Sequence, residues 1–114
     1  MTGAAAVRDV VIGLDLGTTS TKAVAFTPDG SQLAQASHGY ELQTPHPGYA
    51  VQDPQQILAA AYRAVADVAR EVGADRVRGI SFSSAMHSLM GLGPLYEPMT
   101  PVITWGDTRA APQA

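Results

Sequence analysis

The sequence predicts an α/β fold, in which a mixed sheet carries a packed helix. Near the start, runs of β-branched residues that are too short for a helix indicate neighbouring strands. A long amphipathic segment with helix-capping residues at both ends follows, and extended apolar segments come after it. Because a helix between strands returns the chain to the same sheet, this order predicts a crossover connection in addition to hairpins.

The composition limits the class of protein. The 114 residues suit one small domain, and 46% of them are hydrophobic, which is ample for a core. Only 15% are charged, below the roughly 25% of an average soluble domain, so we expect a face that something else covers and a tendency to form homo-oligomers. The absence of cysteine excludes disulfides and thiolate metal sites. A formal net charge of −3 offers no basic surface for nucleic acid.

The start of the chain, MTGAAAVRDV, lacks the basic segment, apolar run and cleavage site of a secretory signal. No apolar run approaches the roughly 18 residues that a membrane span requires. We therefore expect a cytoplasmic chain without a membrane partner.

The first three strands are expected to form an antiparallel meander. Residues 7–16 (VRDVVIGLDL) predict a buried strand, and residues 20–27 (STKAVAFT) alternate between two faces. The turn at residues 28–30 combines a proline and a glycine, and residues 32–42 supply the third strand. The two faces of the second strand are Lys22, Val24 and Phe26 on one side, and Thr21, Ala23 and Ala25 on the other.

A loop over residues 43–52 precedes the predicted helix. Asp53 is the expected N-cap, Pro54 suits the first helical position, and Gln56 would complete a capping box. Gly73 provides the C-terminal stop. The apolar residues at helical spacing, which we expect to face the sheet, are Ile57, Leu58, Ala61, Val65, Val68 and Val72.

Three extended segments are expected after the helix. Residues 77–83 (VRGISFS) predict a strand, and residues 86–92 and 101–105 are further strand candidates. Together with the meander they give a mixed sheet.

The stretch GLDLGTTSTKAVAF joins the first two strands through a cluster of glycine and hydroxyl groups. The backbone N–H groups of Gly17, Thr18 and Thr19 are expected to point outward, where they would suit phosphate oxygens. Asp15 could hold Mg²⁺ directly or through water, and Lys22 could offset phosphate charge. The spacing is not that of a Walker A loop, because a strand follows instead of a helix. The alternative is a hairpin with a polar tip and no ligand.

A second cluster follows the helix. SFSSAMHSLM places Met86 and His87 near a strand end, and ITWGDTR places Trp105, Asp107 and Arg109 at alternating positions. If that stretch is extended, the last three side chains project to one side. An indole, a carboxylate, a guanidinium and an imidazole suit a sugar site. The alternatives are a structural histidine, a tryptophan in a core or interface, and a surface ion pair between Asp107 and Arg109.

The first motif resembles that of the FGGY carbohydrate kinases, a branch of the superfamily that includes actin, hexokinase and Hsp70. The resemblance implies a ribonuclease H-like mixed sheet, with residues 1–114 forming an incomplete N-terminal domain of a two-domain sugar kinase. It implies ATP and Mg²⁺ as cofactors, with Asp15 on the metal through water. It also implies that Gly17, Thr18 and Thr19 line the phosphates and that Lys22 faces them.

The second cluster resembles the Met-His pair and the W-x-D-x-R element that line the family's sugar pocket. This assigns Met86, His87, Trp105, Asp107 and Arg109 to a sugar or sugar acid. The segments FSSAMHSL and TPVITWGDTRA are most similar to those of gluconate kinase-like members. The guanidinium of Arg109 would suit the carboxylate of a sugar acid. Xylulose and other pentuloses or polyols are the alternative substrates.

The resemblance also implies what this chain lacks. The family's catalytic aspartate is expected beyond residue 114, so no catalytic residue is assigned here and the chain alone is expected to be inactive. The alternative is a truncated, non-catalytic domain that binds ligand weakly or associates with itself. Residues 91–100 depart from the family's aspartate-glycine hairpin. His38, His46, Tyr49 and Gln52 are expected to be structural.

Overall fold

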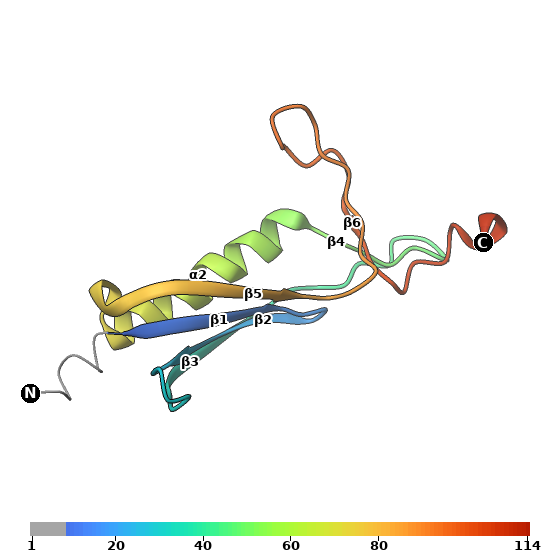
Figure 1. Cartoon of the computed structure of the whole chain (residues 1–114). Coiled ribbons are helices and arrows are strands. Elements are labelled where there is room, and N and C mark those ends of the chain that lie inside the picture. Colours follow the sequence, from blue (N-terminus) through green and yellow to red (C-terminus); the bar gives the residue numbers. More distant parts are fainter. Residues whose placement is uncertain (1–8) are drawn as a thin grey trace, which may run out of the picture.

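The computed structural model describes residues 9–114, and its extents are 63 × 28 × 22 Å. Figure 1 shows a sheet backed by one helix and, at one end, a narrower arm that ends in the C-terminus. The sheet has the order β3-β2-β1-β5. Its strands are β1 (Val10–Leu16), β2 (Ser20–Phe26), β3 (Gln32–Gly39) and β5 (Val77–Ser84).

The pairing of the strands confirms the predicted mixed sheet. β1 pairs with β2 and β2 with β3 in antiparallel register, whereas β5 runs parallel to β1. The parallel pair requires a crossover, which the helix α2 (Pro54–Val72) provides. The first strand begins at Val10 and the third ends at Gly39, so both are shorter than expected; residues 7 and 8 lie outside the described part of the chain.

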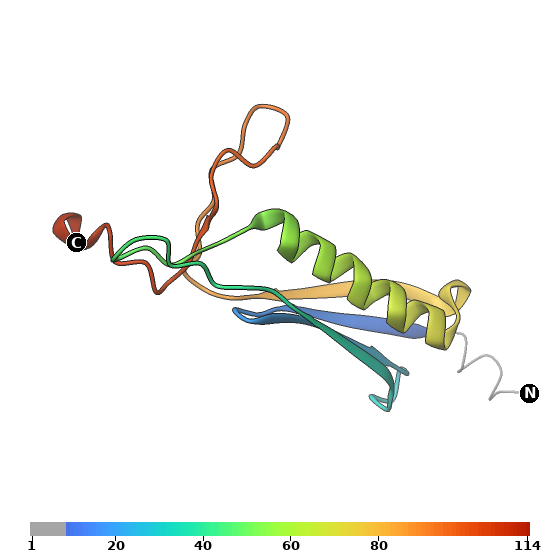
Figure 2. The same cartoon turned by 180° about the vertical axis from the view of Figure 1, so that it is seen from behind.

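The core lies between α2 and one face of the meander, and Figure 2 shows the helix lying across that face. Thr21, Ala23 and Ala25 are buried, which confirms the predicted alternation of β2. The apolar core residues are Val10, Ile12, Leu14, Ala23, Ala25, Ala34, Ala64, Val68 and Val72. Alanines on both layers allow the helix to approach the sheet closely.

The helix begins and ends at the predicted caps. Asp53 Oδ1 accepts a hydrogen bond from the Gln55 amide at 2.8 Å, and Gly73, with φ +96°, follows the last turn. The capping box with Gln56 is wrong, because the Asp53 carboxylate engages Gln55 instead. The expected apolar face is also partly wrong, since Leu58 is 49% exposed. The buried helical positions are Ala60, Ala64, Val68 and Val72, which recur every four residues and so form the row that faces the sheet.

The arm is built differently from the expectation. Residues 51–52, assigned to a loop, form β4 (Val51–Gln52), which pairs with β6 (Val102–Ile103). Residues 86–92 do not form a regular strand and have only isolated bridges to the chain at Ile103 and Pro98. The facing segment contains Pro98 and Pro101, which cannot donate hydrogen bonds to a strand ladder, and this explains why the pairing stays irregular. The remaining elements are the short 3₁₀ helices η1 (Ala74–Arg76) and η2 (Ala111–Gln113).

The helix covers β2 and β3 more than β1, and it leaves most of β5 exposed, although Val77 at the start of β5 packs against the core. Ile80 and Phe82 on β5 are therefore 41% and 70% exposed. Within residues 9–114, no helix has the length and apolar character that a membrane crossing requires.

Candidate functional site

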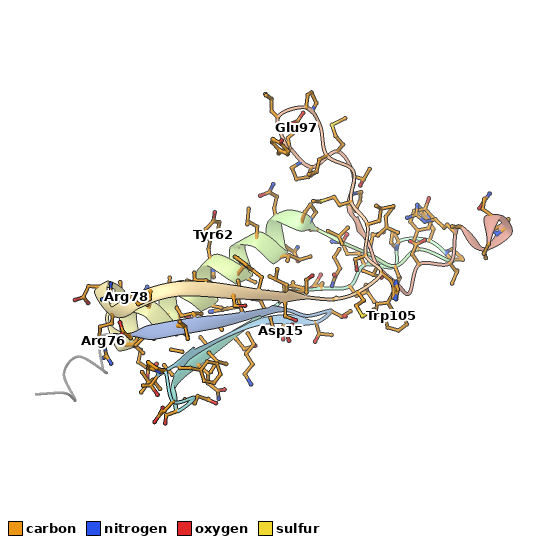
Figure 3. All side chains as sticks on the ribbon, in the orientation of Figure 1. Asp15, Tyr62, Arg76, Arg78, Glu97 and Trp105 are labelled. Carbon is orange, nitrogen blue, oxygen red and sulfur yellow. The ribbon has the colours of Figure 1, made fainter. Side chains whose placement is uncertain are left out.

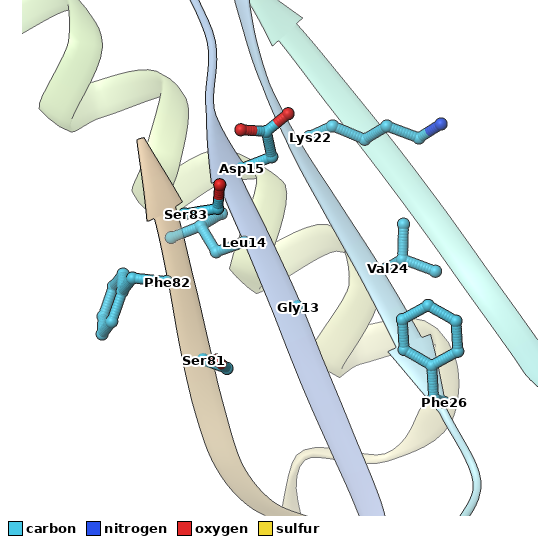
Figure 4. Close-up of a pocket in the computed structure, with 9 residues that line it drawn as sticks. All are labelled: Gly13, Leu14, Asp15, Lys22, Val24, Phe26, Ser81, Phe82 and Ser83. Carbon is cyan, nitrogen blue, oxygen red and sulfur yellow. The ribbon is translucent and has the colours of Figure 1, made fainter. Parts of the chain in front are cut away.

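Asp15 and Lys22 lie opposite each other on neighbouring strands. The register pairs Asp15 of β1 with Lys22 of β2, and the alternation that buries Leu14 turns Asp15 toward the face opposite α2. Figure 4 shows the Asp15 carboxylate beside Ser83 of β5, while the Lys22 side chain extends away along the sheet. In the described part of the chain neither charged group makes an ion pair or a side-chain hydrogen bond, so both are available to a ligand.

These side chains line a shallow hollow of about 280 Å³ on that face. One end carries Asp15, Lys22 and Ser83, and the other carries apolar side chains that include Phe26. The full lining is Gly13, Leu14, Asp15, Lys22, Val24, Phe26, Ser81, Phe82 and Ser83. The hollow therefore offers both charges at one end, at the carboxyl end of β1.

The hairpin tip, residues 17–20, lies next to this pair. The Gly17 amide donates to the Ser20 carbonyl at 2.9 Å, so the expectation that this N–H points outward is wrong. By contrast, no hydrogen bond within residues 9–114 engages the amides of Thr18 and Thr19. A Cβ on Gly17 would lie 2.9 Å from the Ser20 carbonyl oxygen, which explains the glycine at this position. Two outward amides remain for an anion.

Two further residues contact this tip: Gln52, which the sequence analysis expected to be structural, and Tyr40, to which it assigned no role. The Tyr40 hydroxyl donates to the Gly17 carbonyl, and the Gln52 side-chain amide donates to the Thr18 carbonyl. Gln52 is only 4% exposed. The partners lie 23 and 34 residues apart in the sequence, so no local pattern could have revealed these contacts.

Met86 and His87 follow β5 at the same end of the sheet as the hairpin tip. The Ala85 amide donates to the Leu16 carbonyl at 2.9 Å, which places the start of this segment beside the end of β1. Met86 is 72% exposed and His87 has φ +59°, a conformation that turns the backbone sharply. The Met-His pair therefore lies exposed near the hairpin tip.

Trp105, Asp107 and Arg109 do not form an extended row. The Asp107 amide donates to the Thr104 carbonyl at 3.0 Å and closes a turn at residues 105–106, so the expected projection to one side is wrong. Glycine at position 106, directly after the indole, favours this turn. Trp105 is 67% exposed and Figure 3 places it near the junction of sheet and arm.

Asp107 and Arg109 pair with each other, as one of the sequence alternatives stated. Arg109 Nη2 lies 2.9 Å from Asp107 Oδ2, and Nε lies 3.0 Å from Oδ1. The Ala50 amide also donates to this carboxylate at 3.0 Å, and the Asp107 side chain is only 5% exposed. The hydrogen bonds from Arg109, followed by that from Ala50, lower the pKa of Asp107 to about 2.

The Arg109 guanidinium lies over the Tyr49 ring, with its central carbon 3.8 Å from the ring centroid. His46 packs edge-on against the same ring at 5.3 Å. The hydrogen bonds to Asp107 raise the pKa of Arg109 further. The Arg109 side chain is 37% exposed, so part of the guanidinium is open to solvent. The bidentate pair with Asp107 holds it in place.

A divalent cation at Asp15, beside the hairpin tip, would rely on few protein ligands. No group of three or more histidine or acidic side chains within residues 9–114 is arranged to hold a metal. Mg²⁺ commonly uses one or two carboxylates and completes its shell with water and phosphate oxygens. A single exposed carboxylate, Asp15, beside a hairpin tip with two unengaged amides fits this coordination.

Comparison with known proteins shows which family this chain resembles in sequence. The pattern of the N-terminal domain of the FGGY family of carbohydrate kinases matches residues 10–114. Gluconokinase of Bacillus subtilis (strain 168) is 42% identical over 88% of this chain, and xylulose kinase of Staphylococcus epidermidis (strain ATCC 12228 / FDA PCI 1200) is 35% identical over 90%.

Solved structures show the same fold. The gluconate kinase from Lactobacillus acidophilus superposes with a TM-score of 0.81 at 38% identity, over 92% of this chain and 21% of its own. The xylulose kinase from Rhodospirillum rubrum gives 0.84 at 31% identity, over 91% and 22%. The chain spans about a fifth of the length of the curated relatives it matches. It belongs to the FGGY family of carbohydrate kinases and carries part of the N-terminal domain of that family.

Proposed function

We propose that this chain is the N-terminal part of an ATP-dependent kinase that phosphorylates a sugar or sugar acid, with gluconate as the leading substrate. The observation that carries the proposal is the pair of unengaged charges, Asp15 and Lys22, beside two unengaged amides, Thr18 and Thr19. The 42% identity to a gluconokinase supports the choice of substrate. Because ATP is the phosphoryl donor, we assign the protein to the cytoplasm.

In this proposal the hairpin tip binds the phosphates of ATP. The Thr18 and Thr19 amides donate to phosphate oxygens, and Lys22 offsets their charge. Asp15 would hold Mg²⁺ through water, and the metal would supply positive charge that offsets the charge on the phosphates. Gly17 contributes by allowing the close turn, since its own amide is engaged with Ser20.

The sugar is proposed to lie against Met86, His87 and Trp105. An exposed indole covers the C–H face of a sugar, and the imidazole donates to a hydroxyl. Asp107 and Arg109 form the far side of this site. The exposed part of the Arg109 guanidinium is the candidate partner for the gluconate carboxylate, whereas Asp107 mainly orients it.

Phosphoryl transfer also requires a base that accepts the proton of the attacking hydroxyl. Asp15 is assigned to the metal and Asp107 is engaged with Arg109 and Ala50, so neither is assigned as the base. We therefore assign turnover to a longer protein that includes this chain and a later aspartate.

A second candidate function is a non-catalytic domain that binds ligand weakly and associates with itself. The exposed apolar side chains Ile80 and Phe82 on the mostly exposed strand β5 favour it. The two candidates differ in what the isolated chain does with a sugar.

Calorimetric titration of the chain with gluconate and then with xylulose distinguishes them, after circular dichroism shows that it is folded. The kinase proposal predicts saturable binding that His87→Ala or Trp105→Ala abolishes, and tighter binding of gluconate than of xylulose. Arg109→Lys should weaken gluconate binding more than xylulose binding. A folded chain that binds both sugars only weakly, with no loss in the His87→Ala and Trp105→Ala variants, would favour the non-catalytic function.

A further inference from the structure

Tyr40 and Gln52 hold the hairpin tip through its carbonyl oxygens. The Tyr40 hydroxyl donates to Gly17, the Gln52 amide donates to Thr18, and the Tyr40 backbone amide donates to Thr19 at 3.1 Å. Three consecutive carbonyls are thus engaged by one residue after β3 and one residue of β4.

The planarity of the peptide bond turns these contacts into a constraint on the anion site. In a trans peptide the C=O of one residue and the N–H of the next point in opposite directions. The carbonyls of Gly17 and Thr18 point toward Tyr40 and Gln52, so the amides of Thr18 and Thr19 point away from them. These are the two amides that remain unengaged within the described residues.

Both holding residues are fixed in turn. Gln52 is 4% exposed and pairs with Val102 across β4 and β6. The Tyr40 hydroxyl accepts a hydrogen bond from Thr21, which is fully buried, at 3.4 Å. A buried side chain on a paired strand has few alternative positions, so its hold on the tip is rigid.

Gln52 also links two parts of the candidate site. Its strand pairs with β6, which leads directly to Trp105 and the Asp107–Arg109 pair. Its side chain reaches the hairpin tip across a hollow that Leu16, Ser84 and Ser88 also line. Gln52 therefore connects the arm, which carries three of the residues proposed to bind the sugar, to the hairpin tip, which is proposed to bind the phosphates.

We propose that Gln52 and Tyr40 are positioning residues, which aim the Thr18 and Thr19 amides at the phosphates by holding the carbonyls on the other side of the same peptides. This inference rests on the proposed function for the identity of the anion, which is the phosphate chain of ATP. The orientation of the peptides can be tested without any ligand.

The test replaces Gln52 by methionine, which keeps the length and the buried apolar contacts of the side chain but removes its donor. Gln43→Met is the matched control, because Gln43 is exposed, lies on the chain that pairs with Val51, and makes no side-chain hydrogen bond within residues 9–114. Backbone ¹⁵N relaxation of the full 114-residue chain gives order parameters for each amide, and titration with MgADP gives an affinity.

The proposal predicts that Gln52→Met lowers the order parameters of Thr18 and Thr19 from about 0.85 to below about 0.6, while the α2 amides are unchanged. It also predicts MgADP affinity about 3- to 10-fold weaker, the range of one hydrogen bond. Gln43→Met should change neither. If Gln52→Met does not fold, Tyr40→Phe removes the other side-chain contact and serves the same comparison.

Unchanged order parameters at Thr18 and Thr19 in a folded variant would overturn the positioning role. So would loosened amides with unaltered MgADP affinity. If the unmodified chain does not bind MgADP at all, the nucleotide function proposed for this half-site fails. The order parameters then still decide whether Gln52 holds the hairpin tip.

Discussion

Gly17 occupies a position in the hairpin tip where a side chain has no room. Its Cβ would lie 2.9 Å from the Ser20 carbonyl oxygen, a backbone atom that cannot move without opening the turn. Gly17→Ala should therefore cost about 1–3 kcal/mol in the free energy of unfolding and weaken the binding of MgADP, as measured by urea denaturation and titration. Gly79→Ala is the control, because a Cβ there meets nothing within 4 Å; equal effects of the two substitutions would contradict the assignment.

Asp107 gives the arm a specific dependence on pH. Hydrogen bonds from Arg109 and Ala50 lower its pKa from 3.8 to about 2. A carboxyl with a lowered pKa contributes stability above its unfolded pKa, and the contribution is lost as the pH falls through the folded value. The free energy of unfolding should therefore decrease between about pH 4 and pH 2.

The Asp107→Asn variant isolates this effect from other carboxyls, because the pKa values of Asp29 and Asp67 are also lowered. Denaturation curves across that range should fall less steeply for Asp107→Asn than for the unmodified chain. Parallel curves would show that Asp107 contributes nothing to the acid sensitivity.

At the scale of the element, the start of α2 depends on one carboxylate. Asp53 Oδ1 accepts the Gln55 amide at 2.8 Å, which satisfies a helix N–H that has no intrahelical partner. Asp53→Ala should lower the free energy of unfolding by about 1 kcal/mol, measured by urea denaturation. Asp53→Asn keeps a capping oxygen and should retain most of the stability; an equal loss in both variants would point to charge rather than capping.

The elements that sequence patterns predicted are those set by local chemistry. The alternation of β2 and the caps of α2 need only neighbouring residues, and both are confirmed. The arm was predicted less well, because residues 86–92 have strand-like composition but meet prolines that break the ladder. Leu58 shows the other limit, since helical spacing places it near the apolar face, whereas the row that faces the sheet is residues 60, 64, 68 and 72, to which position 58 does not belong.

The same division applies to the candidate site. The motif predicted separate roles for Asp15 and Lys22, in holding Mg²⁺ and in offsetting phosphate charge, and the strand register places the two residues opposite each other. The roles of Tyr40 and Gln52 depend on contacts between distant parts of the chain. The Asp107 carboxylate likewise accepts from Ala50, 57 residues away, which the alternation of W-x-D-x-R could not predict.

At the scale of the whole molecule, α2 covers mainly β2 and β3 of the four-stranded sheet. β5 is an edge strand in the described chain, and its Phe82 side chain is 70% exposed. Exposed edges with apolar side chains pair readily with other chains. Sedimentation velocity over a range of concentrations should therefore detect self-association, which Phe82→Ser should weaken about tenfold.

Tyr62 supplies the control for this prediction. It is 71% exposed, and Figure 3 shows it on α2, pointing away from the sheet. Tyr62→Ser should leave the association unchanged. A chain that stays monomeric at all concentrations would contradict the role of β5 as an interface.

The central claim is that the first hairpin of this chain binds the phosphates of ATP. The most direct test is a titration of the ¹⁵N-labelled chain with MgATP, followed through backbone amide shifts. The account predicts saturable shifts concentrated at Asp15, Thr18, Thr19 and Lys22, which weaken when Mg²⁺ is chelated. The absence of shifts in a folded chain, or shifts confined to residues distant from residues 15–22, would contradict it.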